Sequence, residues 1–285
     1  HRFLPKRNEL QSSIALYKHK GTINMNPISS AKRIVVKVGT STLAYPNCRL
    51  NIRRVEALCK VLSDLKNAGH EVILVSSGAI GMGVGKLLLP KRPDDMPTKQ
   101  AAAAVGQCEL MYTYDRLFAQ YNHTVGQILL TASDVDHEDR YIHFSNTMCR
   151  LLELGVIPIV NENDTITTEE IVIGDNDTLA AIVASSIKAD ILIVLTDIDG
   201  LYTADPHKDK NAKLISFVSN VDSVRGFASG AGSARGTGGM ETKLNAAQIC
   251  IDADVEMIIA NGKNPQNLYD IIDGKHVGTR FGREK

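Results

Sequence analysis

The sequence predicts an α/β protein in which helices cover both faces of a mostly parallel open sheet, giving a three-layer αβα sandwich. Three observations support this prediction. Short β-branched runs alternate with helix-like segments from about residue 31 onward, which is typical of a parallel sheet. The runs are continuous in apolar character, as in strands buried on both faces. Several end directly in glycine or polar residues, as at the edge of such a sheet.

The amino-acid composition limits which classes of protein this chain can belong to. The chain has 285 residues, 44% of them hydrophobic, which is enough for one large core. Lys+Arg and Asp+Glu both number 32, so the overall charge gives no support to nucleic-acid or membrane binding. The sequence contains no membrane-span-length apolar run and no evident secretory signal. Five scattered cysteines without a CxxC pair favour reduced thiols in a cytoplasmic protein: Cys48, Cys59, Cys108, Cys149 and Cys250.

Two parts of the chain differ in pattern. Residues 1–30 show no clean period and begin with His1, so we expect an added or poorly ordered extension, with Met25 as a candidate native start. Residues 31–285 contain no internal repeat or long linker. We therefore expect them to form one domain.

The segment Ala31–Leu43 organises the rest of the prediction. Ile34–Val36 is a β-branched run that favours a buried strand, and Lys37 follows near its carboxyl end. Gly39 permits a turn and a close ligand approach, and Thr40–Thr42 adds hydroxyl groups. A cation, a glycine turn and hydroxyls together suit a phosphate. The alternative is a lysine that merely points to solvent at a strand end.

The next elements are a helix, a strand and a second glycine-rich segment. Apolar residues recur every three or four positions over Asn51–Ala68, which predicts the helix. Glu71–Ser76 is a continuous apolar strand, and Ser77–Gly85 is expected to be a loop whose N–H groups can hold an anion. It fails the P-loop pattern because Leu87 follows Lys86, and its glycine spacing differs from GxGxxG.

The middle of the chain repeats the alternation. Lys99–Gln120 is an alanine-rich helix, Val125–Leu130 a strand, and Leu151–Leu154 the end of a further helix before the strand Val156–Val160. The acidic run Asp134–Asp139 lacks the glycine and closing glutamate of an EF-hand. We expect a solvated helix start there and no metal site.

A polar stretch follows the strand Val156–Val160. Asn161–Asp164 lies directly at the strand end, and Thr165–Ile173 is expected to form a hairpin. Residues 174–177 read as a turn and a cap for a helix over Thr178–Ile187.

The last third supplies another strand and another glycine-rich turn. Asp190–Leu195 is an apolar strand that ends at Thr196 and Asp197, and residues 207–235 are the least regular part. Thr237–Lys243 places two glycines and a lysine at a helix start, which suits a polyphosphate. A helix, a strand and a helix complete the chain: Leu244–Ile251, Val255–Ala260 and Pro265–Ile272.

These features indicate phosphoryl transfer. Ligands bind at the carboxyl ends of parallel strands, where Lys37 and the polar strand ends fall. Lys37 and Lys243 at two glycine-rich turns suggest a nucleotide triphosphate held around its transferring group. The sequence has no Walker A, HRD or DFG element. A carboxylate acceptor needs no base, because it is already ionised at pH 7; lysines, Mg²⁺ and helix N-termini then bring two anions together, with Asp177 orienting the lysines.

Six motifs, in order, resemble the amino acid kinase family and in particular its glutamate 5-kinase branch, over about Lys32 to Lys285. They are KVGTS at 37–41, SSGAIGMG at 76–83, VNENDTI at 160–166, GDNDTLAA at 174–181, LTDIDGLYTADP at 195–206 and GTGGMETK at 236–243. The resemblance implies an open αβα sandwich. It also implies transfer of the ATP γ-phosphate to the side-chain carboxylate of L-glutamate, the first step of proline biosynthesis.

The resemblance also implies roles for matching residues. Lys37 and Lys243 would stabilise the transferring group, with Asp177 organising them. The glutamate-binding residues would be Ser77, Asp164 and Asn176. The ATP-binding residues would be Lys37, Thr196, Asp197, Thr237, Gly238, Gly239, Met240, Glu241, Thr242 and Lys243. No protein ligand for a metal is implied, since Mg²⁺ would arrive on the nucleotide phosphates; proline would be a feedback inhibitor and the protein a homo-oligomer.

One departure and two alternatives stay open. Many bacterial members continue into a C-terminal PUA domain, whereas this sequence stops at Lys285, which puts family-typical oligomer contacts and regulation in doubt. The acceptor could instead be aspartate, N-acetylglutamate or a nucleoside monophosphate. A non-catalytic amino-acid or nucleotide sensor is the alternative from a different class.

Overall fold

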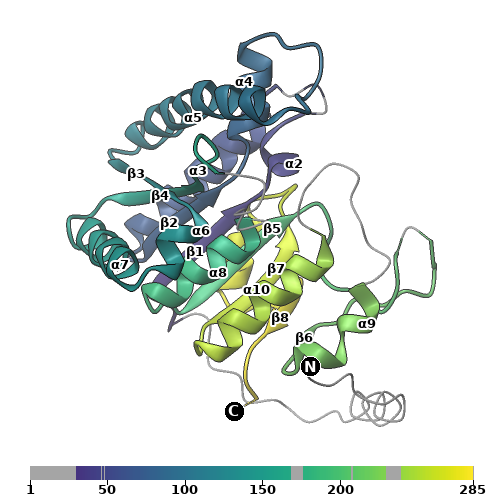
Figure 1. Cartoon of the computed structure of the whole chain (residues 1–285). Helices are drawn as coiled ribbons and strands as arrows, with labels where there is room; N and C mark the ends of the chain where they lie inside the picture. The colour runs from purple at the N-terminus through teal and green to yellow at the C-terminus, as the bar shows by residue number, and fades with distance from the viewer. Residues whose placement is uncertain are drawn as a thin grey trace.

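A computed structural model describes residues 30–284 apart from positions 46, 48, 168–175, 207 and 229–238, and it confirms the predicted α/β class. The described residues form one eight-stranded sheet of order β3-β4-β2-β1-β5-β7-β8-β6 (Figure 1). All neighbouring pairs are parallel except β7 and β8. The strands are β1 Arg33–Val38, β2 Glu71–Ser76, β3 Val125–Leu130, β4 Ile157–Glu162, β5 Ile191–Thr196, β6 Phe217–Val218, β7 Glu256–Asn261 and β8 Thr279–Phe281.

The register of the central strands fixes where a ligand can bind. β1 lies between β2 and β5, and Lys37 is aligned with Val75 on one side and Val194 on the other. Val38 is aligned with Ser76, the last residue of β2. Because these strands are parallel, their carboxyl ends meet at one edge of the sheet, so the residues that follow them share that edge.

Two apolar cores, one on each face of the sheet, hold the layers together. Alternate residues of a strand point to opposite faces, so Val35 belongs to one core and Val36 to the other. Helices α7 (Glu138–Glu153), α8 (Asn176–Ser186) and α10 (Met240–Asp252) cover the Val35 face, and α8 and α10 lie side by side (Figure 1). Helices α3 (Ile52–Asn67), α5 (Met96–Ala119) and α11 (Asn267–Ile272) cover the Val36 face.

The predicted glycine-rich loop is wrong for most of its length. Residues Ala79–Lys86 form helix α4, and of these glycines it is Gly78, with φ at 107°, that makes the turn. Gly83 of α4 and Gly106 of α5 instead allow these two helices to pack closely. A Cβ at Gly83 would lie 1.8 Å from the Ala102 carbonyl oxygen, and one at Gly106 would lie 1.8 Å from that of Ala79. Glycine here allows two helices to touch through their backbones.

Several predicted boundaries and elements also need correction. Helix α5 begins three residues early, because the Asp95 carboxylate accepts the Thr98 N–H at 2.9 Å and caps the helix. Helix α8 begins at Asn176 rather than Thr178, and α10 at Met240 rather than Leu244, so site residues lie inside first turns. The sequence prediction omitted α2 (Thr40–Leu43), β6, η2 (Val221–Ser223), α9 (Arg225–Ala228) and β8.

Three further predictions have different outcomes. The acidic run Asp134–Asp139 covers the end of helix α6 (Ala132–Asp136) and the start of α7, and Asp134 closes a capping box with Thr131, which agrees with the expected helix start. Most of the predicted hairpin over 165–173 lies outside the described residues.

The four described cysteines form no disulfide, and burial raises the pKa of the Cys250 thiol to about 12. None of the helices in the described ranges has the length and apolar character needed to cross a bilayer.

Candidate active site

Two lysines and one aspartate meet at the carboxyl edge of the sheet. The Asp177 carboxylate bridges them: its Oδ1 lies 2.6 Å from the Lys37 Nζ, and its Oδ2 lies 2.9 Å from the Lys243 Nζ. Asp177 is fully buried, and each lysine is 6% exposed. The structure thus brings together the three residues predicted to be catalytic, from elements that are far apart in the sequence.

The strand and helix periods explain this meeting. Lys37 is two residues after Val35 on β1, so its side chain points to the face covered by α8 and α10. Asp177 is in the first turn of α8, where a carboxylate also interacts favourably with the positive end of the helix dipole. Lys243 lies one turn into the neighbouring helix α10. Each charged group therefore approaches the same point from a different element.

The electrostatics of this cluster favour an anion. The cluster sets two ammonium groups around one carboxylate, in a place where water screens charges weakly. The N-termini of α8 and α10 add partial positive charge at the same edge. At Gly39 an added Cβ would lie 3.6 Å from the Lys37 Nζ, so the missing side chain leaves this ammonium group approachable.

A second, uncharged cluster lies beside the first. The Asn176 side-chain amide donates to the Ser77 Oγ at 2.6 Å and to the Asn161 Oδ1 at 3.0 Å. Asn161 in turn donates to the Gln107 Oε1 at 2.9 Å. The structure therefore joins Ser77 and Asn176, two of the predicted substrate residues, through direct hydrogen bonds.

Gln107 is a residue of this cluster that sequence reasoning missed, and Asn161 was noted only as part of a polar run. Gln107 lies on the buried face of α5 and is 7% exposed. A signal was available in the sequence: Ala103, Gln107, Leu110 and Tyr114 recur at helical spacing, which places a polar amide on an otherwise apolar stripe. The Tyr114 hydroxyl also shares a 2.8 Å hydrogen bond with Ser76, which ties α5 to the end of β2.

Asp164, the third predicted substrate residue, follows the end of β4 and is half-buried. Burial raises the pKa of its carboxyl group to about 6, and the positive charge of Arg92 opposes this rise. The group therefore changes charge close to neutral pH, which is unusual for an aspartate.

The predicted nucleotide residues are only partly brought together. Thr196 is buried at the end of β5, and its hydroxyl donates to the exposed Asp197 at 3.2 Å. Gly239 is extended and caps α10, while Thr237 and Gly238 lie outside the described residues.

Within the first turn of α10 the side chains have different surroundings. Met240 is buried in the core, the Glu241 carboxylate pairs with Arg225 at 2.6 Å, and the Thr242 hydroxyl donates to the Gly239 carbonyl oxygen at 2.8 Å. Lys243 is thus the residue of this turn whose charge reaches the Asp177 cluster. Met240, Glu241 and Thr242 can serve a nucleotide through their backbone N–H groups rather than their side chains.

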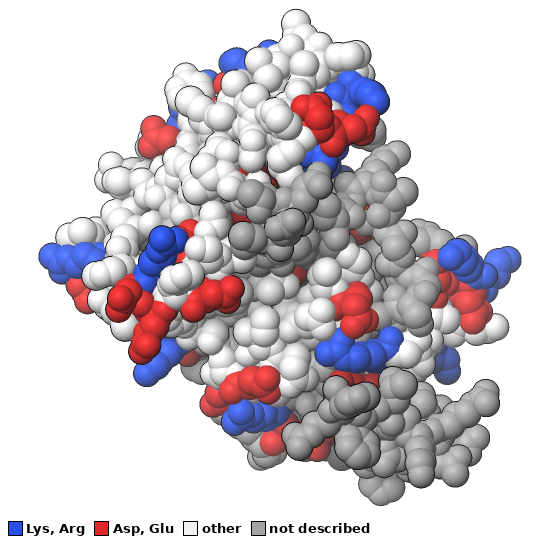
Figure 2. All heavy atoms as spheres, in the orientation of Figure 1, with Lys and Arg blue, Asp and Glu red and all other residues white. Residues whose placement is uncertain are grey.

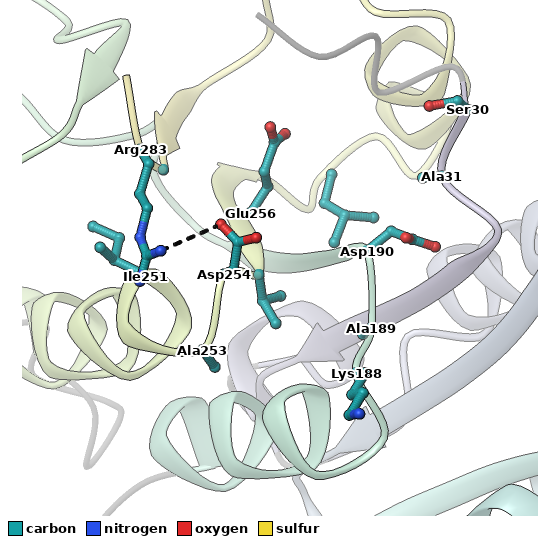
Figure 3. A pocket seen from close by; sticks show the side chains of 13 residues that line it. Ser30, Ala31, Lys188, Ala189, Asp190, Ile251, Ala253, Asp254, Glu256 and Arg283 are labelled. Atoms are coloured by element: carbon teal, nitrogen blue, oxygen red, sulfur yellow. Dashed lines mark ion pairs between the residues drawn. The ribbon is translucent and has the colours of Figure 1, made fainter. Parts of the chain in front are cut away.

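A hollow at the opposite edge of the sheet is lined by both acidic and basic side chains and differs from the two-lysine cluster at the carboxyl edge. It lies at the amino ends of β5 and β7, and Figure 3 shows the Asp254–Arg283 pair across it at 3.9 Å. The Asp190 carboxylate accepts two main-chain N–H groups at the start of β1, and Glu256 pairs with Arg280. On the face shown in Figure 2, acidic and basic side chains are likewise interspersed.

Comparisons with known proteins show the family and the fold of the chain. The amino acid kinase family model matches residues 32–261. Glutamate 5-kinase of Clostridium perfringens is 50% identical over 263 residues, covering 90% of this chain and 98% of that protein. Glutamate 5-kinase of Clostridium acetobutylicum is 52% identical over 255 residues, covering 89% and 96%. The T. acidophilum isopentenyl phosphate kinase structure shares the fold, with a TM-score of 0.61 at 18% identity over 88% of this chain and all of that one (100%).

Proposed function

The chain belongs to the amino acid kinase family and, within it, to the glutamate 5-kinases, and from this premise we propose that it transfers the γ-phosphoryl group of ATP to the side-chain carboxylate of L-glutamate. The product is L-glutamyl 5-phosphate, the acyl phosphate that begins proline biosynthesis. The observation that carries the proposal is the buried Lys37–Asp177–Lys243 cluster at the carboxyl edge of the sheet.

In the proposed reaction two anions must approach each other. A glutamate carboxylate oxygen forms a bond to the γ-phosphorus, and the bond from that phosphorus to the β–γ bridging oxygen breaks, releasing ADP. Lys37 and Lys243 stabilise the charge on the transferring group and on the leaving oxygen. Asp177 holds the two ammonium groups in place and takes no proton, because the acceptor is already ionised.

The amide cluster suits the amino-acid substrate. The Ser77 oxygen accepts from Asn176, so its own hydroxyl hydrogen can be donated to a substrate carboxylate. The Asp164 carboxylate can accept from the α-ammonium group when it is ionised. Ser77, Asp164 and Asn176 are therefore the residues that we assign to glutamate.

The nucleotide is assigned to the same edge. Thr196, Asp197 and the segment Thr237–Lys243 would hold ATP, with the N-terminus of α10 directed at its phosphates. Mg²⁺ needs few protein ligands when phosphate oxygens are present, because it usually keeps several waters and binds substrate phosphates. The nucleotide phosphates would therefore hold Mg²⁺, which neutralises part of their charge.

A coupled ADP-release assay tests the proposal. The chain is supplied with ATP, Mg²⁺ and L-glutamate, and hydroxylamine traps the acyl phosphate as a hydroxamate that can be quantified. Aspartate, N-acetylglutamate and a nucleoside monophosphate serve as alternative acceptors. The proposal requires glutamate to be preferred; calorimetric binding of glutamate without ADP release would instead favour a sensor.

Feedback inhibition by proline, a homo-oligomeric state and a cytoplasmic location stay predictions from the family resemblance. Proline added to the same assay tests the first, and light scattering tests the second. The division into residues 1–30 and a kinase domain over 31–285 is likewise a proposal, tested by deleting residues 1–30 and measuring turnover.

A further inference from the structure

Three side-chain amides, one of them the assigned glutamate residue Asn176, form a hydrogen-bonded row. The row begins at the main-chain N–H group of Glu162. The Glu162 N–H donates to the Asn161 Oδ1 at 2.9 Å, and Asn176 donates to the same oxygen at 3.0 Å. The Asn161 Nδ2 donates to the Gln107 Oε1 at 2.9 Å. The residues come from β4, α8 and α5, so the row crosses from one layer of the fold to another.

The hydrogen bonds of this row fix the orientation of each side-chain amide, so that its oxygen and nitrogen cannot exchange places. A main-chain N–H can only donate, so the Glu162 N–H requires the Asn161 side chain to present its oxygen there and its nitrogen toward Gln107. Gln107 must then present its oxygen. Asn176 faces two acceptors, the Asn161 Oδ1 and the Ser76 carbonyl oxygen at 3.5 Å, so it must present its nitrogen. Each orientation is thus set by hydrogen-bond chemistry.

The fixed orientations leave two buried atoms without a hydrogen-bond partner in the described part of the chain: the Asn176 Oδ1 and the Gln107 Nε2. A buried polar atom that lacks a partner is uncommon and calls for an explanation, of which a bound ligand is one. The Asn176 Oδ1 is an acceptor. L-Glutamate has one group that can donate a hydrogen bond at neutral pH, its α-ammonium, since both carboxylates only accept.

We propose that Gln107 is a positioning residue for the amino-acid substrate. Acting through Asn161, it holds the Asn176 amide with Oδ1 directed at the α-ammonium group of glutamate. Gln107 itself does not touch the reacting atoms. This inference rests on the proposed glutamate kinase function and adds to it a residue outside the predicted site.

Two substitutions at Gln107 test the role. Gln107→Met keeps the length and bulk of the side chain but removes the oxygen that fixes Asn161, whereas Gln107→Glu keeps an accepting oxygen. We expect Gln107→Met to raise the KM for glutamate about tenfold and to leave the KM for ATP within about twofold of the unmodified protein. Gln107→Glu should restore much of the glutamate KM. Gln120→Met, at the exposed end of the same helix, is the matched control and should change neither constant.

A second readout identifies the substrate group concerned. Glutarate has both carboxylates of glutamate but no ammonium group, so it tests binding by the carboxylates alone. As a competitive inhibitor it should bind the unmodified protein and Gln107→Met with the same inhibition constant. An equal loss for glutarate and glutamate would overturn the assignment to the ammonium group.

The outcomes separate this inference from the proposed function. If the unmodified protein turns over with glutamate and Gln107→Met leaves the glutamate KM unchanged, the positioning role is wrong and the kinase function stands. If Gln107→Met raises both KM values and lowers the melting temperature together, Gln107 is structural and the inference is again wrong. No glutamate-dependent turnover by the unmodified protein would remove the proposed function itself, and with it the inference that rests on it.

Discussion

Two neighbouring residues in the first turn of α8 face chemically different regions of the site. Asp177 lies between two lysines, in a cluster held by ion pairs of 2.6 and 2.9 Å. Asn176, one position earlier, lies in a cluster of neutral amides and a serine hydroxyl. Successive residues of a helix point about 100° apart, so one turn can supply both regions.

The difference between the two regions follows from what each must recognise. Charge that builds up on a transferring phosphoryl group is best stabilised by fixed cations, which the ionic region supplies. An amino acid must be held by its pattern of donors and acceptors, which oriented amides can match. We therefore expect changes in the ionic region to lower kcat, and changes in the amide region to raise the KM for glutamate.

Lys243→Ala should give the largest effect. Removing one of two cations from the transferring group should lower kcat about 10²- to 10³-fold, the loss typical for one electrostatic stabiliser. The KM for glutamate should change little, because the lysine is not in the amide region. Steady-state kinetics measure both constants, and Lys60→Ala, on the exposed side of α3, is the control. Equal losses in kcat and glutamate binding would contradict the role assigned to Lys243.

Asp177→Asn should give the next largest effect. The amide keeps the shape of the side chain but loses the charge that separates two lysines, each 6% exposed. Breaking a buried ion-pair network in this way costs about 3–5 kcal/mol of folding free energy, and kcat should fall about tenfold to a hundredfold as the lysines lose their alignment. Urea unfolding and kinetics measure the two. Asp139→Asn, at an exposed position, should change neither; a rise in glutamate KM alone would show that the two regions are not distinct.

Asn176→Ala tests the amide region with a smaller expected effect. The variant loses the hydrogen bonds to Ser77 and Asn161, together with the oxygen that we assign to the α-ammonium group. A hydrogen bond to a charged group contributes about 1.5–3 kcal/mol, so the KM for glutamate should rise about tenfold to a hundredfold. The kcat at saturating glutamate should fall far less. A loss confined to kcat would mean that Asn176 belongs with its neighbour Asp177.

The ionic region was the easier of the two to predict from sequence. Lys37 ends a β-branched run and Lys243 follows two glycines, and both patterns depend only on nearby residues. Asp177 was predicted from the charge balance to orient the lysines, and the family resemblance implied the same role. Gln107 was not predicted, because its role depends on which face of an alanine-rich helix is buried and on what comes to lie opposite. That arrangement is a tertiary one, and the close backbone contact between Gly106 and Ala79 is part of it.

Glycine explains the main error in the predicted fold. Gly78 has a positive φ and makes the turn that the sequence predicted, but Gly83 is helical and is needed for contact with α5. Composition alone cannot separate these two uses of glycine, because both follow from the absence of a Cβ. The short strand β8, antiparallel to β7, was missed for a related reason: three residues carry too little pattern to be read locally.

The pH dependence of glutamate binding should be the smallest effect and should belong to the amide region. Burial raises the pKa of Asp164 to about 6, so its carboxyl group is ionised above that pH and neutral below it. Only the ionised form attracts the α-ammonium group. The KM for glutamate should therefore be constant near pH 8 and should rise several-fold between pH 7 and pH 5, where the substrate carboxylates stay mostly ionised.

The ionisation of Asp164 should affect folding stability in the opposite direction from glutamate binding: higher pH favours binding but lowers the free energy of unfolding. The folded protein holds this proton more tightly than the unfolded chain, in which an aspartate has a pKa of about 3.9. The contribution of Asp164 to stability is therefore present below about pH 4 and is lost as the pH rises through 6. Asp164→Asn should remove both dependences while raising the glutamate KM at pH 8 toward the value seen at pH 5. Arg92→Ala removes the charge that lowers the pKa of Asp164, so it should move the midpoint of the KM profile to higher pH. A midpoint that stayed fixed in both variants would assign the titration to another group.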